Sequence, residues 1–234
     1  MAVTIGSARI DERGKTAGGA PGDQTGKEVS AQAFYAHTKG WRVFRPKDTA
    51  AAEKLAAAMR AACANENIGY SQGERNALWK LVRDKGYDPA KADEKTSCDC
   101  SSLARVCCAY AGIMTGDFTT ESEPKALAAT GAFTELSGAA YTKTGEKLQA
   151  GDILVTASKG HTAVVLTPAR ASGTVLKDGK WNVRSGAGKG FVSLGTLAGG
   201  TALTVLERTE DGWLRVAFES APAYGWVSES AVRA

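Results

Sequence analysis

The segment KTSCDCSSLARVCCAYAG, residues 95–112, contains four of the five cysteines of the chain. Its pattern predicts a helix from Cys100 to Tyr110 that stops at Gly112. Asp99 is a suitable N-cap for this helix, which would make Cys100 its first residue. The cysteines could form a metal site, a disulfide, or one nucleophile with unreactive neighbours, and the choice between these decides the function of the chain.

The spacing of the cysteines suits a metal site poorly. Zinc ligands usually come as two Cys-x2–4-Cys pairs, or as cysteines with a pair of histidines. Here one residue separates Cys98 from Cys100, Cys107 and Cys108 are adjacent, and the chain contains 2 histidines. A Cys98–Cys100 disulfide would close a small strained ring. We therefore expect no metal and no other cofactor. A zinc protein remains an alternative, and it predicts stoichiometric metal and unfolding by a chelator.

Cys100 is the best candidate for a nucleophile. The N–H groups and the dipole at a helix N-terminus stabilise a thiolate, whereas Cys107 and Cys108 lie about two turns further along. A cysteine nucleophile also needs a base within hydrogen-bond reach. His161 precedes the apolar run in KGHTAVVL and is a better candidate than His37; the alternative is that His161 lies in a surface turn.

The composition is that of an ordinary soluble protein. The 234 residues are 43% hydrophobic and 23% charged, with a net charge of +4. Lys and Arg are scattered, which gives no indication of a nucleic-acid partner. The N-terminus lacks the pattern of a signal peptide, and no stretch approaches the roughly 20 apolar residues of a membrane span. We expect synthesis in the cytoplasm, without a signal peptide, and reduced cysteines.

Two domains are expected. Residues 1–30 are rich in Gly and Thr and suggest an ordered loop or an arm; WRVFRP (41–46) predicts a strand. Helices are expected from Asp48 or Thr49 to about residue 67 and from Gln72 to Lys85. Two strands, 152–156 and 161–167, end a domain that spans residues 1–167. A linker over 168–178 and a small barrel of about six short strands over 179–234 would follow.

The segments around Cys100 and His161 resemble those of a known family. DCSSL (99–103) followed by GDILVTASKGHTAVVL (151–166) is similar to the NlpC-like papain-fold peptidases of the cell wall. IGYSQGER (68–75) and GAPGDQTGKEV (19–29) resemble segments of phage-type and prophage members. The resemblance implies an α+β papain-like fold and acyl transfer with Cys100 as nucleophile and His161 as base.

The same resemblance implies a substrate and its binding residues. Members of the family cleave the stem peptides of peptidoglycan, commonly after γ-D-glutamate, and the residues of this chain that would line the stem-peptide pocket are Tyr70, Ser71, Asp99 and Ser101. Members usually place a third polar residue on the strand after the histidine strand, but TPARASGTVLK (167–177) has none at the expected distance. Asp23 or Gln24 is a candidate for this third catalytic residue; the alternative is that they anchor a loop.

Residues 179–234 resemble a bacterial SH3-type wall-binding domain. WNVRSGAG (181–188), DGWLRV (211–216) and GWVSESAV (225–232) occur in the order typical of that domain. The resemblance implies a small all-β barrel that binds the wall. Trp213, Tyr224 and Trp226 could offer aromatic faces to a ligand or could belong to the core.

Together these features predict an endolysin-like peptidoglycan hydrolase that cleaves stem peptides, most simply at a γ-D-glutamyl bond. An N-acetylmuramoyl-L-alanine amidase and a non-catalytic wall-binding protein are the alternatives. The expected partner is bacterial peptidoglycan, the expected place of action is the bacterial wall, and the expected origin is a phage or prophage. The sequence leaves the oligomeric state open.

Overall fold

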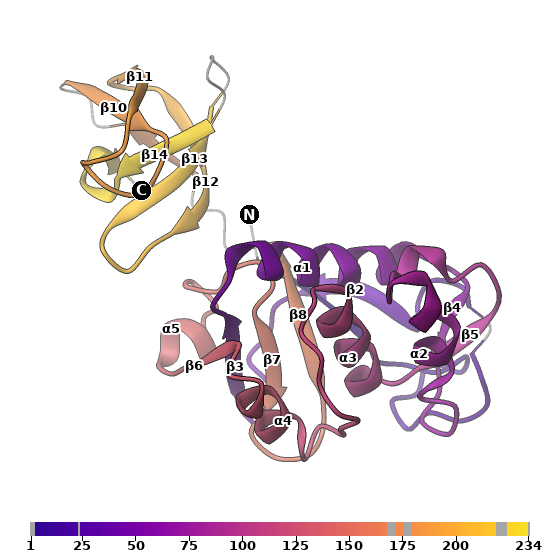
Figure 1. The fold of residues 1–234 in the computed structure, drawn as a ribbon. Helices are drawn as coiled ribbons and strands as arrows, with labels where there is room; N and C mark the ends of the chain where they lie inside the picture. Colours follow the sequence, from indigo (N-terminus) through magenta and orange to yellow (C-terminus); the bar gives the residue numbers. More distant parts are fainter. Residues whose placement is uncertain (1–2, 23, 168–171, 176–178, 219–223, 234) are drawn as a thin grey trace. The chain divides into compact units, whose positions relative to one another are not determined.

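The computed structural model describes residues 3–22, 24–167, 172–175, 179–218 and 224–233. The chain divides into two compact units, Val3–Thr167 and one that includes Pro168–Ala234. The first combines helices with a sheet and the second is built of strands (Figure 1). An α+β region followed by an all-β region is the arrangement that the sequence predicts.

A six-stranded antiparallel sheet forms one layer of the first unit. Its strands follow the order β2-β1-β8-β7-β3-β6. Their bounds are β1 Thr4–Ala8, β2 Val29–Ala33, β3 Trp41–Pro46, β6 Phe133–Leu136, β7 Ile153–Thr156 and β8 Thr162–Thr167. Arg45 on β3 holds the fully buried carboxylate of Asp152 through two bonds of 2.8 and 2.7 Å. This bidentate ion pair fastens β3 to the start of β7.

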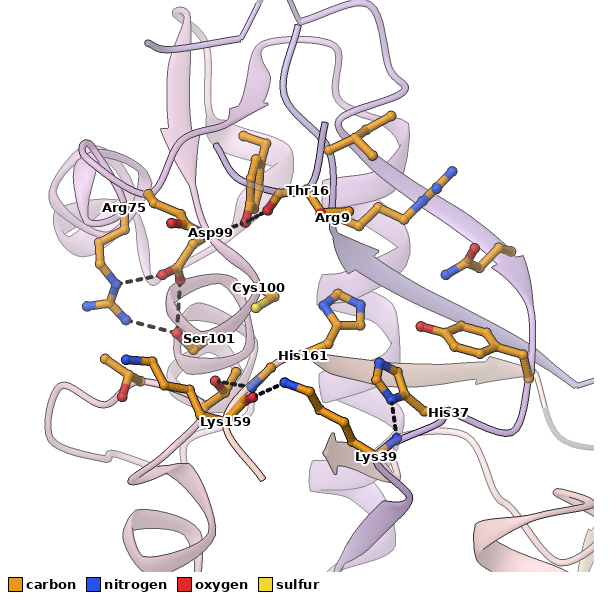
Figure 2. A pocket seen from close by; sticks show the side chains of 18 residues that line it. Arg9, Thr16, His37, Lys39, Arg75, Asp99, Cys100, Ser101, Lys159 and His161 are labelled. Atoms are coloured by element: carbon orange, nitrogen blue, oxygen red, sulfur yellow. Dashed lines mark hydrogen bonds and ion pairs between the residues drawn. The ribbon is translucent and has the colours of Figure 1, made fainter. Parts of the chain in front are cut away.

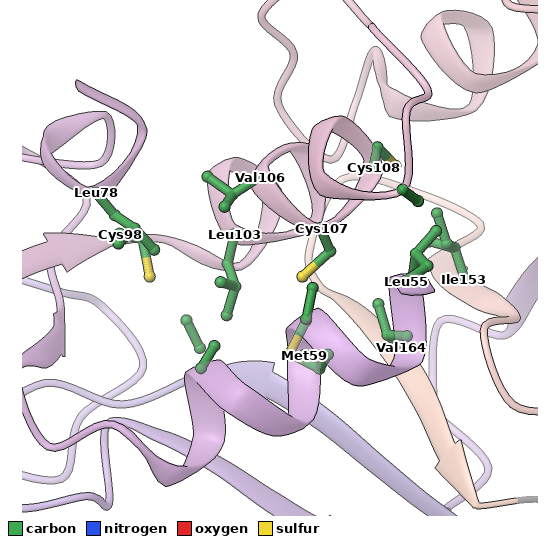
Figure 3. Packing of buried hydrophobic residues seen from close by; sticks show 14 of the residues in the cluster. Leu55, Met59, Leu78, Cys98, Leu103, Val106, Cys107, Cys108, Ile153 and Val164 are labelled. Carbon is green, nitrogen blue, oxygen red and sulfur yellow. The ribbon is translucent and has the colours of Figure 1, made fainter. Parts of the chain in front are cut away.

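The two longest helices of this unit, α1 (Thr49–Ala64) and α3 (Cys100–Tyr110), pack against each other and against β1 and β8. Asp48 caps α1 by accepting from the backbone N–H of Ala50 at 3.1 Å. Side chains from α1, α3 and β8 meet in a continuous apolar core (Figure 3). The labelled members from these three elements are Leu55, Met59, Leu103, Val106, Cys107, Cys108 and Val164.

Shorter elements surround this core. β4 (Ile68–Tyr70) and β5 (Thr96–Cys98) form a parallel pair, and β5 leads directly into α3. The expected helix from Gln72 to Lys85 is shorter than predicted: α2 spans Ala77–Val82 and a 3-10 turn, Arg83–Lys85, follows it. The remaining elements are a second 3-10 turn (Pro89–Lys91), α4 (Glu123–Ala129) and α5 (Ala139–Thr142).

The expectation of a loop or arm over residues 1–30 was wrong in part. β1 lies inside the sheet between β2 and β8, and the first residues of β2 fall within the same range. Neither TIGSA nor VSAQA has the continuous β-branched and aromatic pattern that predicts a strand from sequence. Pairing with β8, which is about 160 residues away, fixes β1, and such a distant contact leaves no local signal.

The second unit is an all-β sheet in the order β11-β10-β14-β13-β12-β9-β15. It has its own apolar core, which includes Val183, Leu214 and Val227. The bounds are β9 Ser172–Val175, β10 Lys180–Arg184, β11 Ser193–Ala198, β12 Ala202–Arg208, β13 Trp213–Ala217, β14 Tyr224–Ser228, a 3-10 turn Glu229–Ala231 and β15 Val232–Arg233. β9 lies within the range expected to be a linker and pairs with β12 and β15.

Candidate active site

Cys100 is the first residue of α3. The Asp99 side chain accepts from the Ser102 backbone N–H at 2.7 Å, and the Ser102 hydroxyl accepts from the Asp99 backbone N–H at 2.9 Å. This reciprocal capping box fixes the start of the helix at Cys100. Cys100 is a free thiol with 8% of its surface exposed. The thiol therefore lies at the N-terminal end of the helix dipole, as the sequence predicts.

His161 directly precedes β8. Its backbone N–H donates to the Thr156 hydroxyl at 2.9 Å, and that hydroxyl lies 3.1 Å from the His161 carbonyl oxygen. The ring Nε2 is 3.2 Å from Oγ of Ser7 on β1. His161 and Cys100 both line a pocket of about 640 Å³ (Figure 2). The fold thus brings together two residues that are 61 positions apart in the sequence.

Burial changes the acidity of both groups. Desolvation, with a smaller contribution from the Asp99 charge, raises the pKa of the Cys100 thiol to about 12. Desolvation, followed by the His37 and Arg9 charges, lowers the pKa of His161 to about 4. Before substrate enters, the pocket therefore favours a neutral thiol beside a neutral imidazole. A neutral imidazole can accept the thiol proton, which is the role of a general base.

Gln24, the residue expected to be the third member of the catalytic group, lies elsewhere. It is buried, has a left-handed backbone with φ of 56°, and its amide packs against Gly69 on β4. Gln24 is absent from the pocket lining; within the described ranges, the side chain that contacts the His161 ring through a hydrogen bond is Ser7. Asp23, the other candidate, lies outside the described residues. The position of Gln24 therefore fits the alternative interpretation, in which this residue anchors a loop.

Asp99, Ser101 and Arg75 form one hydrogen-bonded group at the pocket wall (Figure 2). Arg75 Nε donates to Asp99 Oδ2 at 2.8 Å, and its Nη2 donates to the Ser101 hydroxyl at 3.0 Å. The Ser101 hydroxyl in turn donates to Asp99 Oδ1 at 3.0 Å. The structure thus brings two of the expected substrate-binding residues together. It adds Arg75, which belongs to the segment IGYSQGER.

The two remaining expected residues differ in placement. Tyr70 lines the pocket, and its hydroxyl donates to the Thr16 carbonyl oxygen at 3.2 Å. Ser71 is fully buried and absent from the pocket lining; its hydroxyl donates to the Gly19 carbonyl oxygen at 2.7 Å. Ser71 therefore holds the N-terminal segment in place, whereas Tyr70 contacts the pocket directly.

Several pocket residues carry no recognisable sequence signal. Arg9, Lys39 and Lys159 bring positive charge to the lining, and Lys39 Nζ donates to the Lys159 carbonyl oxygen at 2.5 Å. Tyr35 and His37 also line the pocket. These residues come from separate segments, and a single Lys or Arg in a loop looks the same in sequence whether or not a fold turns it towards a pocket.

The four clustered cysteines do not form one group. Cys98, Cys107 and Cys108 belong to the apolar core (Figure 3), whereas Cys100 lines the pocket (Figure 2). The described ranges contain no group of three or more His, Cys, Asp or Glu side chains arranged to hold a metal ion. Within the same ranges, no helix is both long and apolar enough to cross a bilayer.

Comparisons with known proteins identify both parts of the chain. The family described as "Endolysin-like domain" matches residues 5–172, and the family described as "Bacterial SH3 domain" matches residues 178–233. No curated protein and no solved structure matches the chain. Because the first match spans well over half of the sequence, the chain belongs to the endolysin-like family. Together with the SH3 domain, this membership supports a peptidoglycan hydrolase that acts at the cell wall.

Proposed function

We propose that the protein is a papain-like cysteine endopeptidase that cleaves the stem peptides of peptidoglycan, with Cys100 as nucleophile and His161 as general base. The observation that carries this proposal is the meeting of a thiol at a helix N-terminus with a neutral imidazole in one pocket. The capped helix start and the antiparallel sheet that carries the histidine fit the NlpC-like pattern that the sequence resembles.

The proposed reaction has two steps. Cys100 Sγ attacks the peptide carbonyl carbon while its proton passes to His161, and the C–N bond then breaks as the protonated His161 gives its proton to the leaving amine. Water, deprotonated by His161, next attacks the thioester, and the thiol is released. The Cys100 backbone N–H at the helix start is a candidate oxyanion donor, a contact worth roughly 3 kcal/mol of transition-state stabilisation.

Ser7 takes the place of the third catalytic residue in this proposal. Its hydroxyl contacts Nε2 of His161, which leaves Nδ1 for the proton of Cys100. Ser7 is 1% exposed, so its hydroxyl is held by the surrounding sheet. A hydroxyl that accepts a hydrogen bond from the Nε2–H group would fix both the tautomer and the orientation of the ring, as the carboxamide or carboxylate does in other cysteine and serine hydrolases.

An acidic stem peptide fits the charges of the pocket. Arg9, Lys39 and Lys159 can contact the carboxylates of such a peptide. The Asp99 carboxylate accepts three hydrogen bonds, from Ser101, Ser102 and Arg75, which leaves about one lone-pair site for a substrate amine. These features support cleavage next to γ-D-glutamate.

The SH3-type domain is proposed to hold the enzyme on the wall. Among the described residues of this domain, four large apolar side chains are exposed: Phe191 (51%), Val192 (71%), Leu194 (44%) and Tyr224 (60%). Exposed apolar groups of this size commonly belong to binding surfaces. Because the first unit belongs to the endolysin-like family, we propose that the protein is a phage or prophage lysin that acts at the bacterial wall.

Digestion of purified peptidoglycan tests the proposed activity. Wild-type protein, Cys100→Ala and Cys63→Ala are compared, and the fragments are identified by mass spectrometry. We expect stem remnants ending in free D-glutamate from the wild type and from Cys63→Ala, whose thiol lies outside the pocket, and none from Cys100→Ala. Intact stems released from muramoyl lactyl groups would instead identify an amidase. Absence of products from the wild type would contradict the proposal.

A further inference from the structure

Glu123, the first residue of α4, is an acidic side chain buried without a cation. It is 0% exposed, and none of the ion pairs among the described residues includes it. Its Oε1 lies 2.9 Å from the Thr162 hydroxyl, whereas Oε2 has no hydrogen-bond partner within the described part of the chain. An ionised carboxylate in these surroundings would carry a desolvation cost of several kcal/mol.

The hydrogen bonds of Thr162 indicate that the Glu123 carboxyl group carries a proton. Thr162 Oγ1 is 2.9 Å from Glu123 Oε1 and also 2.9 Å from the carbonyl oxygen of Leu154. A hydroxyl has one proton to donate, and a carbonyl oxygen can only accept. Both contacts are hydrogen bonds when Glu123 is protonated and donates to Thr162, which then donates to Leu154. Burial also raises the pKa of Glu123 well above its ordinary value.

This group of residues is in contact with the catalytic pair. Thr162 directly follows His161, and its backbone N–H interacts with the Cys100 sulfur and favours the thiolate form. On the other side of His161, the Gly160 N–H donates to the Thr120 hydroxyl at 3.1 Å. The segment that ends at Glu123 therefore holds the chain on both sides of the histidine, and Thr120 and Gly160 line the pocket themselves.

We propose that Glu123 is a positioning residue: as a neutral carboxylic acid it fixes Thr162, and thereby holds the Thr162 N–H against Cys100 and keeps His161 in place. In the described part of the chain, the titratable groups that interact electrostatically with Glu123 are Asp99, Cys100 and Cys108, and the latter two lie on α3. An ionised Glu123 would add a second negative charge, beside that of Asp99, next to the reacting thiol. The catalytic consequence rests on the proposed function, but the contact with Cys100 does not.

Alkylation of Cys100 by iodoacetamide tests this inference without any peptidoglycan. The rate is followed against pH by peptide mapping, with Cys100→Ala as the blank and Glu146→Gln, at an exposed acid, as the matched control. Glu123→Gln keeps a neutral donor at the same place, so its rate should stay within about threefold of the wild type, less than half a unit of thiol pKa. Glu123→Ala and Thr162→Val release the Thr162 N–H, so the thiol pKa should rise by about one unit and the rate below pH 9 should fall about tenfold.

An ionised Glu123 predicts a change in the alkylation rate of the opposite sign. If Glu123 were ionised, Glu123→Gln and Glu123→Ala would remove a negative charge next to Cys100, and alkylation would become faster in both; this outcome would overturn the proposal. Unchanged rates in Glu123→Ala and Thr162→Val would overturn it as well. Circular dichroism identifies any variant that fails to fold, in which case the pair Thr162→Val and Thr162→Ser carries the comparison. A wild type that shows this alkylation pattern but releases no peptides would contradict the proposed function and leave this inference standing.

Discussion

At the scale of single residues, the half-buried imidazole of His161 couples folding to pH. Its pKa is about 4 in the folded protein against an ordinary value of 6.5. Between these values the unfolded chain binds a proton that the folded chain does not, so stability falls as the pH drops from 6.5 towards 4. At pH 4 the loss should reach about 3 kcal/mol.

Urea unfolding of the wild type and of His161→Gln measures this effect. The difference in unfolding free energy between the two proteins should change by about 3 kcal/mol between pH 7 and pH 4, because all other acids and bases are common to both. A pH-independent difference would show that His161 titrates normally in the folded protein.

Ser7 offers a second test at this scale. Ser7→Ala leaves Nε2 of His161 buried without a partner and frees the ring to turn, so turnover should fall roughly 10- to 100-fold. Thr4→Ala is a matched control, because Thr4 lies on the same strand as Ser7 but outside the pocket lining, and its hydroxyl contacts the Thr167 hydroxyl instead. Equal turnover in the two variants would remove Ser7 from the catalytic group.

The sequence predicts the proposed nucleophile and base but not Ser7, whose hydroxyl contacts the histidine ring. Cys100 follows a capping residue and His161 begins an apolar strand, and both signals are local. Ser7 lies 154 positions from His161 in a segment with no motif, and only the pairing of β1 with β8 brings them together. Gln24 was a reasonable candidate by residue type, but its amide packs against Gly69.

At the scale of elements, the start of α3 links stability to reactivity. Asp99 caps the helix, and its negative charge also raises the pKa of the Cys100 thiol. Asp99→Asn keeps a capping oxygen but removes the charge, so it should lower the thiol pKa and speed alkylation of Cys100. Asp99→Ala should also lose the cap, at a cost of about 1 kcal/mol of unfolding free energy.

Asp117→Asn is the matched control for both Asp99 variants. Asp117 accepts from Arg75 at 2.8 Å, as Asp99 does, but it neither caps α3 nor shifts the pKa of Cys100. Urea unfolding and alkylation rates are measured for all three variants. Slower alkylation in Asp99→Asn than in Asp117→Asn would contradict the electrostatic role given to Asp99.

Elements with a strong local pattern were predictable, and those held by distant pairing were not. The strand WRVFRP matches β3, Asp48 caps α1, and the two predicted strands around residue 160 match β7 and β8 to within one residue. β1 and β9, which are both short, were not predicted from the sequence. β1 is fixed by its pairing with β8, far away in the sequence, and β9 by its pairing with β12 and β15.

At the scale of the whole molecule, each unit has a separate apolar core. The first core includes Leu55 and Leu103, the second includes Val183 and Leu214, and the two sets share no residue. A unit with its own core can fold alone. We therefore expect a chain of residues 1–167 to cleave soluble stem peptides at a rate close to that of the full chain.

The same truncation should separate catalysis from attachment. Without the SH3-type domain, the catalytic unit no longer gains a high local concentration at the wall, so hydrolysis of intact walls should fall about tenfold or more while hydrolysis of soluble peptides is retained. Co-sedimentation with walls measures attachment, with full-length Cys100→Ala as the bound but inactive control. If residues 1–167 sediment with walls as well as the full chain does, the first unit itself binds the wall. The exposed apolar side chains of the second unit would then bind something other than the wall.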